Sequence, residues 1–309
     1  MSGDFITVIN QVMILTAIIG CGFLGKRTGL VKNEAFETLT NITLYFAVPC
    51  LLIRAFQIEF TPDSLIGFFL QLGIAAVYHA IAGITGLLVF RRAPEQKKRV
   101  YICCLVNGNI GFMGYAMILT LFGNAGMFYA SAYNLVFNIV FWSVCIGYLN
   151  QESEKATFRS ILLNPNIASA LIGFMIFILQ IRLPDVVDRG MGYLASLSMP
   201  IPLIVIGARL TELKPRLLAG DKYFWICALL RLLVLPLLFG GALRILGVSG
   251  LLLQVTVILS GMPTASMLGM LAGKNDPEIG SYTAGVISGI TALSMITIPV
   301  TAAFAALMA

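Results

Sequence analysis

The stretch VILSGMPTASMLGMLAG, residues 257–273, has the apolar composition of a membrane helix but a centre that interrupts helices. Pro263 lies in its middle, beside Gly261 and the hydroxyl side chains of Thr264 and Ser266. Proline removes a helix hydrogen bond, and glycine weakens a helix. Backbone groups freed in this way must face protein or a water-filled cavity, because lipid cannot satisfy them. The stretch therefore predicts an interrupted membrane helix with a polar centre.

The composition of the whole chain is that of an integral membrane protein. Of its 309 residues, 59% are hydrophobic and 11% are charged, whereas soluble proteins contain roughly 25% charged residues. The apolar runs are long and continuous, which favours membrane helices over a β-barrel. The first run, Phe5 to Gly25, follows acidic Asp4 and is long enough to span a bilayer, so we do not expect a cleaved signal peptide.

Ten apolar runs form two groups of five. We expect membrane helices near residues 5–25, 38–57, 63–90, 99–121, 124–149, 165–182, 190–210, 221–247, 251–272 and 278–308. The predicted organisation is a first five-helix repeat at 1–149, a short cytoplasmic linker at 150–164 and a second repeat at 165–309.

Basic residues are concentrated in alternate loops, those after the first, third, fifth, seventh and ninth runs. These loops contain Lys26, Arg27, Lys32, Arg91, Arg92, Lys97, Lys98, Arg99, Lys155, Arg159, Lys214, Arg216, Lys222 and Lys274. The opposite loops hold Arg182, Arg189 and Arg244, with Arg54 near a helix end. The positive-inside rule therefore places both termini outside the cell (inner) membrane. This cytoplasmic collar accounts for the net charge of +6, so we expect no nucleic-acid partner.

The two halves share unusual residues at matching positions. An offset of 153 residues aligns Pro49 with Pro202 and Gly108 with Gly261. Because each half has five spans, the second half enters the membrane in the opposite orientation, as in an inverted-topology repeat. The fourth run contains NGNIGFMGYAM, residues 107–117, at the position that matches the opening stretch. Interrupted segments at matching positions indicate a transporter substrate site, with tight helix packing through small residues as the alternative.

Such a pair of interrupted helices favours an anion. Helix N-termini carry about half a positive charge and free N–H groups, and asparagine side chains add donors. In the fifth run, Asn134 and Asn138 lie one turn apart on one face. In the eighth run, Arg231 either binds the substrate carboxylate or pairs with backbone carbonyls. His79, in the third run, is a second intramembrane candidate for a functional role, and the alternatives are a neutral packing histidine or a proton sensor. The expected substrate-binding residues are Asn107, Gly108, Asn109, Asn134, Asn138, Gly261, Met262, Pro263, Thr264 and Arg231.

The sequence lacks the residue patterns of carboxylate-coupled transport, metal binding and enzymatic catalysis. The acidic residues lie in loops or near helix ends, so we expect no coupling through an intramembrane carboxylate pair. The sequence still allows a sodium site built from carbonyls and hydroxyls, such as those of Ser260, Thr264 and Ser266. The six cysteines form no CxxC pair, and His79 is the single histidine. We therefore expect no metal, no cofactor and no enzymatic activity.

The motifs resemble those of the auxin efflux carrier family. NGNIGFMGYAM resembles the Asn- and Gly-rich fourth helix of that family, and MPTA (262–265), YFAVPCLL (45–52) and FLGKRTGL (23–30) add to the resemblance. It covers essentially the whole chain. The family includes the plant PIN-FORMED auxin exporters and bacterial permeases associated with malonate, malate and other organic anions. The short linker looks like that of a bacterial member.

The resemblance implies a fold similar to sodium/proton antiporters and bile acid symporters. Helices 1, 2, 6 and 7 would form a scaffold that makes a homodimer, and helices 3–5 and 8–10 a moving transport domain in which broken helices 4 and 9 cross. The chain departs from the family at Ala116, where members often carry proline. The expected function is a secondary transporter in the lipid bilayer that moves a small organic anion, an auxin-like monocarboxylate or a dicarboxylate, by alternating access. The alternative is a membrane sensor that binds the anion without transporting it.

Overall fold

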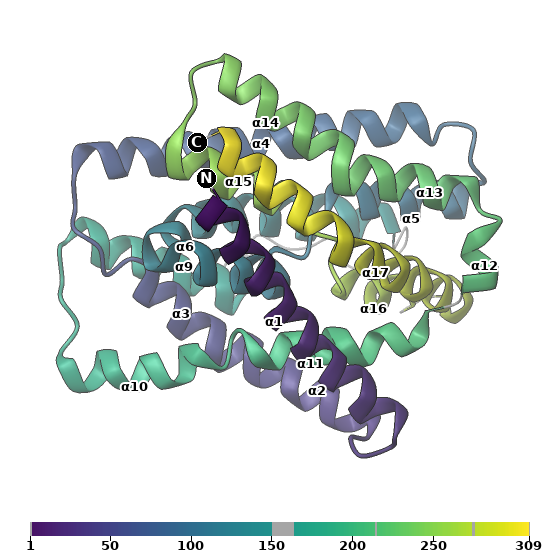
Figure 1. Ribbon diagram of the computed structural model, residues 1–309, viewed down its shortest axis with the longest axis horizontal. Coiled ribbons are helices and arrows are strands. Elements are labelled where there is room, and N and C mark those ends of the chain that lie inside the picture. Colours follow the sequence, from purple (N-terminus) through teal and green to yellow (C-terminus); the bar gives the residue numbers. More distant parts are fainter. Residues whose placement is uncertain (1, 150–163, 214, 274–275, 309) are drawn as a thin grey trace.

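A computed structural model describes residues 2–149, 164–213, 215–273 and 276–308, and Figure 1 shows their arrangement. Within these ranges the chain is helical, with one isolated β-bridge and no longer strand. The all-α membrane class expected from composition is therefore confirmed. Most of the linker (150–163) and the basic residues Lys155, Arg159, Lys214 and Lys274 lie outside the described residues, as does the side chain of Arg216.

Six helical stretches among the described residues are long and apolar enough to cross a membrane, and two shorter apolar helices accompany them. The six are Glu34–Ala55, Pro62–Val89, Ile110–Leu149, Asp185–Glu212, Lys222–Ile245 and Pro277–Met308. The shorter two are Pro165–Ile178 and Gly250–Ser260. In hydrocarbon a helix satisfies its own backbone, which is why apolar runs of this length adopt it.

The first half of the chain consists of ten helical elements. In order they are α1 (Ser2–Arg27), α2 (Asn33–Ile42), η1 (Thr43–Ala47), α3 (Val48–Ala55), α4 (Pro62–Val89), α5 (Glu95–Val106), η2 (Ile110–Gly114), α6 (Tyr115–Val140), η3 (Phe141–Cys145) and α7 (Ile146–Leu149). Inside α6, Gly123 has a positive φ of 59° and breaks the helix. This one glycine separates the runs expected at 99–121 and 124–149, because few other residues adopt that conformation.

Among the described residues, the second half consists of eleven helical elements. Its elements are α9 (Pro165–Ile178), α10 (Asp185–Ser196), α11 (Pro200–Arg209), η4 (Leu210–Glu212), α12 (Pro215–Ala219), α13 (Lys222–Leu229), η5 (Leu230–Val234), α14 (Leu235–Ile245), α15 (Gly250–Ser260), α16 (Met267–Gly273) and α17 (Pro277–Met308). Capping residues in the local sequence determine where several helices begin. Thr61 and Ser64 form a capping box before α4, and Asn164 and Asp221 cap α9 and α13 with their side chains.

Contacts between distant helices hold the elements together. The helix α1 lies against α11, and α3 contacts α9 and α10. The α1–α11 contact is close because a Cβ at Gly22 would fall on the carbonyl oxygen of Ile204, and one at Gly207 on that of Ile19. Elsewhere, α4 contacts α5 and α6, while α17 contacts α15, α16 and α1, and α3 also contacts α6. Figure 1 shows α10, α11 and α3 along the lower side and α4, α13 and α14 along the upper side.

The connecting loops collect at two opposite ends of the molecule. In Figure 1 the α3–α4, α9–α10 and α14–α15 connections lie toward the left, and the α4–α5 connection and α12 lie toward the right. The right-hand end therefore carries the basic α4–α5 loop with Arg91 and Arg92. At the left-hand end, Arg54 of α3 binds Asp188 of α10 through two hydrogen bonds of 2.8 and 3.1 Å.

Candidate functional site

The two interrupted helices meet at their interruptions. The chain leaves the helix between α5 and η2, and again between α15 and α16. The backbone N–H of Asn109 donates to the carbonyl of Pro263 at 2.6 Å, and that of Ala265 donates to the carbonyl of Asn107 at 3.0 Å. These bonds pair Gly108 with Thr264 in an antiparallel bridge. Backbone groups freed from two distant segments thus satisfy one another, as buried polar groups require.

The first interruption forms without a proline at Ala116. Ala116 is buried inside α6, and the non-helical residues 107–109 precede it by two turns. Thr264 adds a side-chain bond across the crossing, because its Oγ1 donates to the carbonyl of Cys104 at 3.0 Å. The pairing with the second segment therefore supplies the partners that stabilise this break.

Arg231 lies at the crossing with 1% of its surface exposed. Its Nε donates to the carbonyl of Met262 at 2.9 Å, and its Nη1 donates to the carbonyl of Leu105 at 2.9 Å. Both carbonyls lie at C-terminal ends of half-helices, where the helix dipole is negative. The guanidinium therefore neutralises two such ends at once. A Cβ at Gly108 would fall on Nη2 of Arg231, so a larger residue there would displace the guanidinium.

Tyr78 of α4 makes further hydrogen bonds at the crossing. Tyr78 donates its hydroxyl to the carbonyl of Ser260 at 2.9 Å and accepts a weaker bond of 3.4 Å from Nη1 of Arg231. The neighbouring His79 bonds through Nδ1 to the carbonyl of Ala75 on its own helix at 2.7 Å. The Arg231 side chain is thus held by backbone carbonyls and a tyrosine.

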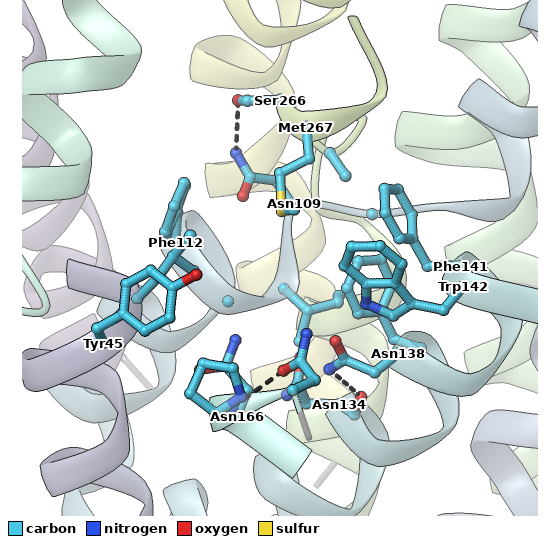
Figure 2. Close-up of a pocket in the computed structure, with 18 residues that line it drawn as sticks. Tyr45, Asn109, Phe112, Asn134, Asn138, Phe141, Trp142, Asn166, Ser266 and Met267 are labelled. Carbon is cyan, nitrogen blue, oxygen red and sulfur yellow. Dashed lines mark hydrogen bonds between the residues drawn. The ribbon is translucent and has the colours of Figure 1, made fainter. Parts of the chain in front are cut away.

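A cavity of about 380 Å³ is lined by Gly108 of the bridge and its neighbours Asn109 and Ala265, and we call it the crossing pocket. Its polar lining includes the side chains of Asn109, Asn134, Asn138, Asn166 and Ser266. Its aromatic lining is formed by Tyr45, Phe112, Phe137, Phe141 and Trp142. Among the described residues, no Asp, Glu, Lys, Arg or His lines the pocket. Figure 2 shows Asn134 and Asn166 below Asn109, with Ser266 above it. The site therefore combines neutral amides with aromatic walls.

The amides of the crossing pocket are only partly used by the protein. Nδ2 of Asn109 lies 3.4 Å from Oγ of Ser266, and Nδ2 of Asn138 donates to the backbone carbonyl of Asn134 at 2.8 Å. In contrast, Nδ2 of Asn134 and Oδ1 of Asn166 are buried and have no hydrogen-bond partner. Leaving a buried donor unpaired costs about 1–3 kcal/mol. Asn134 and Asn166, two residues of the pocket lining, each carry one such unpaired atom.

Helix N-termini also face the pocket. Gly111 and Phe112, in the first turn of the helix that continues through η2 into α6, line it together with Ser266 and Met267 at the start of α16. The first N–H groups of a helix lack partners within the helix and carry partial positive charge. These helix starts lie on the same cavity as Asn134.

All four π-helical segments of the described chain supply residues to this region. Tyr45 comes from η1, Phe112 from η2, Trp142 from η3 and Arg231 from η5. Such segments leave the regular helical register and occur often at functional sites. Here they surround the crossing.

The structure separates the sequence-predicted residues into two sets. Gly108, Asn109, Asn134 and Asn138 line the crossing pocket. The other six, Asn107, Gly261, Met262, Pro263, Thr264 and Arg231, belong to the crossing but not to the pocket lining. Asn107, for example, donates to the carbonyl of Cys103 at 2.9 Å and to Sγ of Cys145.

Sequence reasoning missed Tyr45, Trp142, Asn166 and Ser266 as candidates for ligand contact. Asn166 was detectable, because it is a polar residue at the start of an apolar run. The sequence indicates Ser266 only as a possible sodium ligand. Tyr45 and Trp142 carry no local signal, since aromatic residues occur throughout the chain.

Comparison with known proteins agrees with this architecture. Residues 7–302 match the model of a family described as membrane transport protein. The chain therefore belongs to this membrane transport family, which is the family of the auxin efflux carriers. The resemblance inferred from the motifs is confirmed at this level.

Two archaeal proteins are similar along most of their length. An uncharacterized transporter of Methanocaldococcus jannaschii is 23% identical over 270 residues, which cover 84% of this chain and 86% of the relative. An uncharacterized transporter of Methanothermobacter thermautotrophicus is 23% identical over 295 residues, covering 94% and 96%. The protein is thus a multi-pass membrane transporter and not an enzyme.

Proposed function

We propose that the protein is a secondary transporter for small organic carboxylates and that the crossing pocket is its substrate site. The observation that carries this proposal is the buried, unpaired amide of Asn134, a residue that lines the pocket together with the start of the η2–α6 helix. A carboxylate oxygen can accept from that amide and from the first N–H groups of the helix. No fixed charge lines the pocket among the described residues, so a bound anion meets no acidic repulsion.

The pocket walls favour a carboxylate with an apolar or aromatic body. Five aromatic rings line the cavity, and ring–ring contacts in offset or edge-to-face geometry add to the free energy of burial. An indole-type monocarboxylate would place one charge at the amides and its ring among these side chains. A dicarboxylate, the second candidate, would need a further set of donors, which Asn109 and Ser266 could provide. Neutral amides compensate a second buried charge less well than cations do.

The proposed architecture is ten helices in two inverted repeats. Under the 153-residue offset, the interruption at 107–109 corresponds to residues 260–262, where the interruption between α15 and α16 begins. The π-helical segment η1 likewise matches the gap between α10 and α11, and Pro49 and Pro202 both lie in the first turn of the helix that follows. These correspondences support a duplicated design.

The proposed mechanism is alternating access by movement of one helix group against the other. Tyr45 and Asn166 belong to helices 2 and 6 of the expected scaffold, whereas Asn109 and Asn134 belong to helices 4 and 5 of the expected transport domain. A pocket lined from both groups changes its exposure when they shift. We further propose a homodimer through the scaffold helices, termini outside the cell membrane, and transport without an intramembrane carboxylate pair.

A thermal-shift screen on detergent-purified protein tests the site. Indole-3-acetate, phenylacetate, malonate and malate are compared for their effect on the unfolding midpoint. We expect the aromatic monocarboxylates to raise it most, and Asn134→Ala to weaken that response. Asn124→Ala is the matched control, because Asn124 is exposed on α6 away from the pocket. Equal responses of the two variants would exclude this pocket. A ligand that binds without being transported would favour the sensor alternative.

A further inference from the structure

A second cavity, of about 720 Å³, lies between α4, α5 and the α6–α7 region, and we call it the α4–α5 groove. Its wall on α4 runs from Ala76 to Leu87, and its other walls include Val106 and Tyr148. Apart from His79 and Tyr148, its side chains are aliphatic or cysteine, with one glycine, Gly83. The groove shares no lining residue with the crossing pocket.

The groove has the length of one bilayer leaflet. Ala76 and Leu87 are eleven residues apart on a continuous helix, which corresponds to about 16 Å at the α-helical rise. Half of a hydrocarbon core measures about 15 Å. Because α4 ends at Val89, the groove extends from mid-membrane to the end that carries the basic α4–α5 loop. Its dimensions and lining fit an extended acyl chain.

Positive charge lies at the end of the groove next to the basic α4–α5 loop. The Arg99 guanidinium is 5.9 Å from the ring centroid of Tyr148, which lines the groove. Lys98 and Arg99 share the single carboxylate of Glu95, at 3.4 and 3.1 Å, so the cluster retains an excess positive charge. Arg91 is exposed in the adjoining loop. A phosphate group at this level would complete the charge balance.

We propose that the α4–α5 groove binds an anionic phospholipid, with one acyl chain in the groove and the phosphate at Arg99 and Lys98. The groove is connected to the crossing through Cys145, which lines the groove and accepts the hydrogen bond from Asn107. An acyl chain there packs against residues that hold the first interruption. The bound lipid therefore stabilises the crossing.

Native mass spectrometry of the full-length protein, delipidated in detergent, tests the proposal with dioleoyl phosphatidylglycerol and dioleoyl phosphatidylcholine as probes. Gly83→Leu fills the groove, since the nearest atom to a Cβ at this position is Cγ2 of Val106 at 3.9 Å. Gly73→Leu is the matched control on the same helix, because Gly73 lies outside the groove and a Cβ there meets no atom within 4 Å. We expect Gly83→Leu to lose the bound phosphatidylglycerol and Gly73→Leu to retain it.

The head group is tested separately. Arg99→Gln is expected to lower the preference for phosphatidylglycerol over phosphatidylcholine about fivefold, the effect of one basic residue at an anionic surface. Arg244→Gln, at the opposite end of the molecule, is expected to leave it unchanged. Equal binding of the two lipids by the wild type, or equal lipid retention by the two leucine variants, would overturn the proposal. A loss of dimer in Gly83→Leu without loss of lipid would also overturn it, since a second copy of the chain would then cover the groove.

Discussion

Nε of Arg231 donates a hydrogen bond to the carbonyl oxygen of Met262 at 2.9 Å, directly beyond the end of helix α15. The same guanidinium reaches the carbonyl of Leu105, in the last turn of α5. One buried cation thus joins the C-terminal ends of two half-helices that are far apart in sequence. This relationship makes Arg231 a positioning residue that holds the crossing together.

Arg231→Met is expected to lower the free energy of unfolding by about 2–4 kcal/mol, because two buried carbonyls lose charge-assisted hydrogen bonds. Arg231→Lys should recover only part of the loss, since an ammonium group lacks the planar fork that reaches both carbonyls. Unfolding in detergent provides the measurement, with Arg244→Gln as the exposed control. Wild-type stability of Arg231→Met would contradict the assigned role.

Gly108 and Gly111 provide a matched pair within the first interruption. A Cβ at Gly108 would fall on Nη2 of Arg231, whereas a Cβ at Gly111 meets no atom within 4 Å. Gly108→Ala is therefore expected to lower the thermal midpoint by several degrees, and Gly111→Ala to leave it within about one degree, an effect typical of an unhindered position. Equal midpoints for the two variants would refute the close approach of Arg231 to this backbone.

Asn107 and Asn134 should separate stability from binding. The Asn107 side chain bonds Cys103 and Cys145 inside the protein, while Nδ2 of Asn134 is unpaired. Asn107→Ala is expected to cost about 1–2 kcal/mol of stability. Asn134→Ala is expected to leave the ligand-free midpoint nearly unchanged and to weaken carboxylate binding about tenfold, the value of one hydrogen bond to a charged group. Isothermal titration and thermal unfolding together check both. The reverse pattern would remove Asn134 from the site.

Much of the crossing could be predicted from sequence, because its signals are local. Proline and glycine in an apolar run mark an interruption, and a second such segment at the repeat offset marks its partner. Asn109, Asn134 and Asn138 stood out because amides are costly in hydrocarbon and so gather where they have a use. The structure places all three on one cavity.

The remainder depends on contacts between helices, which leave no local signal. The partners of Arg231 are backbone carbonyls, and any residue supplies these, so sequence could not decide between a carboxylate and a carbonyl partner. The π-helical segments that position Tyr45 and Trp142 have no sequence signature of their own. The turn at Gly123 was expected as a short gap between runs, and only the backbone shows that it is a single residue.

Asp221 gives the fold a pH dependence at the basic end of the molecule. Its carboxylate caps α13, accepts from Lys97 at 2.7 Å and accepts from Tyr282 at 2.7 Å. Burial raises the pKa of Asp221, but the hydrogen bonds from Lys97 and Tyr282 and the Lys97 charge together outweigh it. They hold the pKa below its usual value of 3.8. The charged form is thus favoured in the folded state.

A pKa lower in the folded than in the unfolded state stabilises the fold above the unfolded value, and this contribution is lost as the pH falls through the folded value. Asp221→Asn is therefore expected to be less stable than the wild type by a constant amount between about pH 5 and pH 8, because the unfolded pKa is about 3.9. The difference should shrink below about pH 4. Thermal unfolding across this range tests it, with Asp185→Asn at an exposed site as control. A difference that grows on acidification would contradict the assignment.

Uptake into proteoliposomes tests the central claim most directly. Purified wild-type protein is reconstituted, and radiolabelled indole-3-acetate, or the strongest stabiliser from the thermal-shift screen, is exchanged against internal unlabelled ligand. The account predicts saturable exchange that protein-free liposomes lack. Asn134→Ala should slow this exchange about tenfold, the cost of one hydrogen bond to a carboxylate. Asn124→Ala should leave it unchanged. Saturable binding of the ligand with no exchange by the wild type would contradict it and leave a sensor in its place.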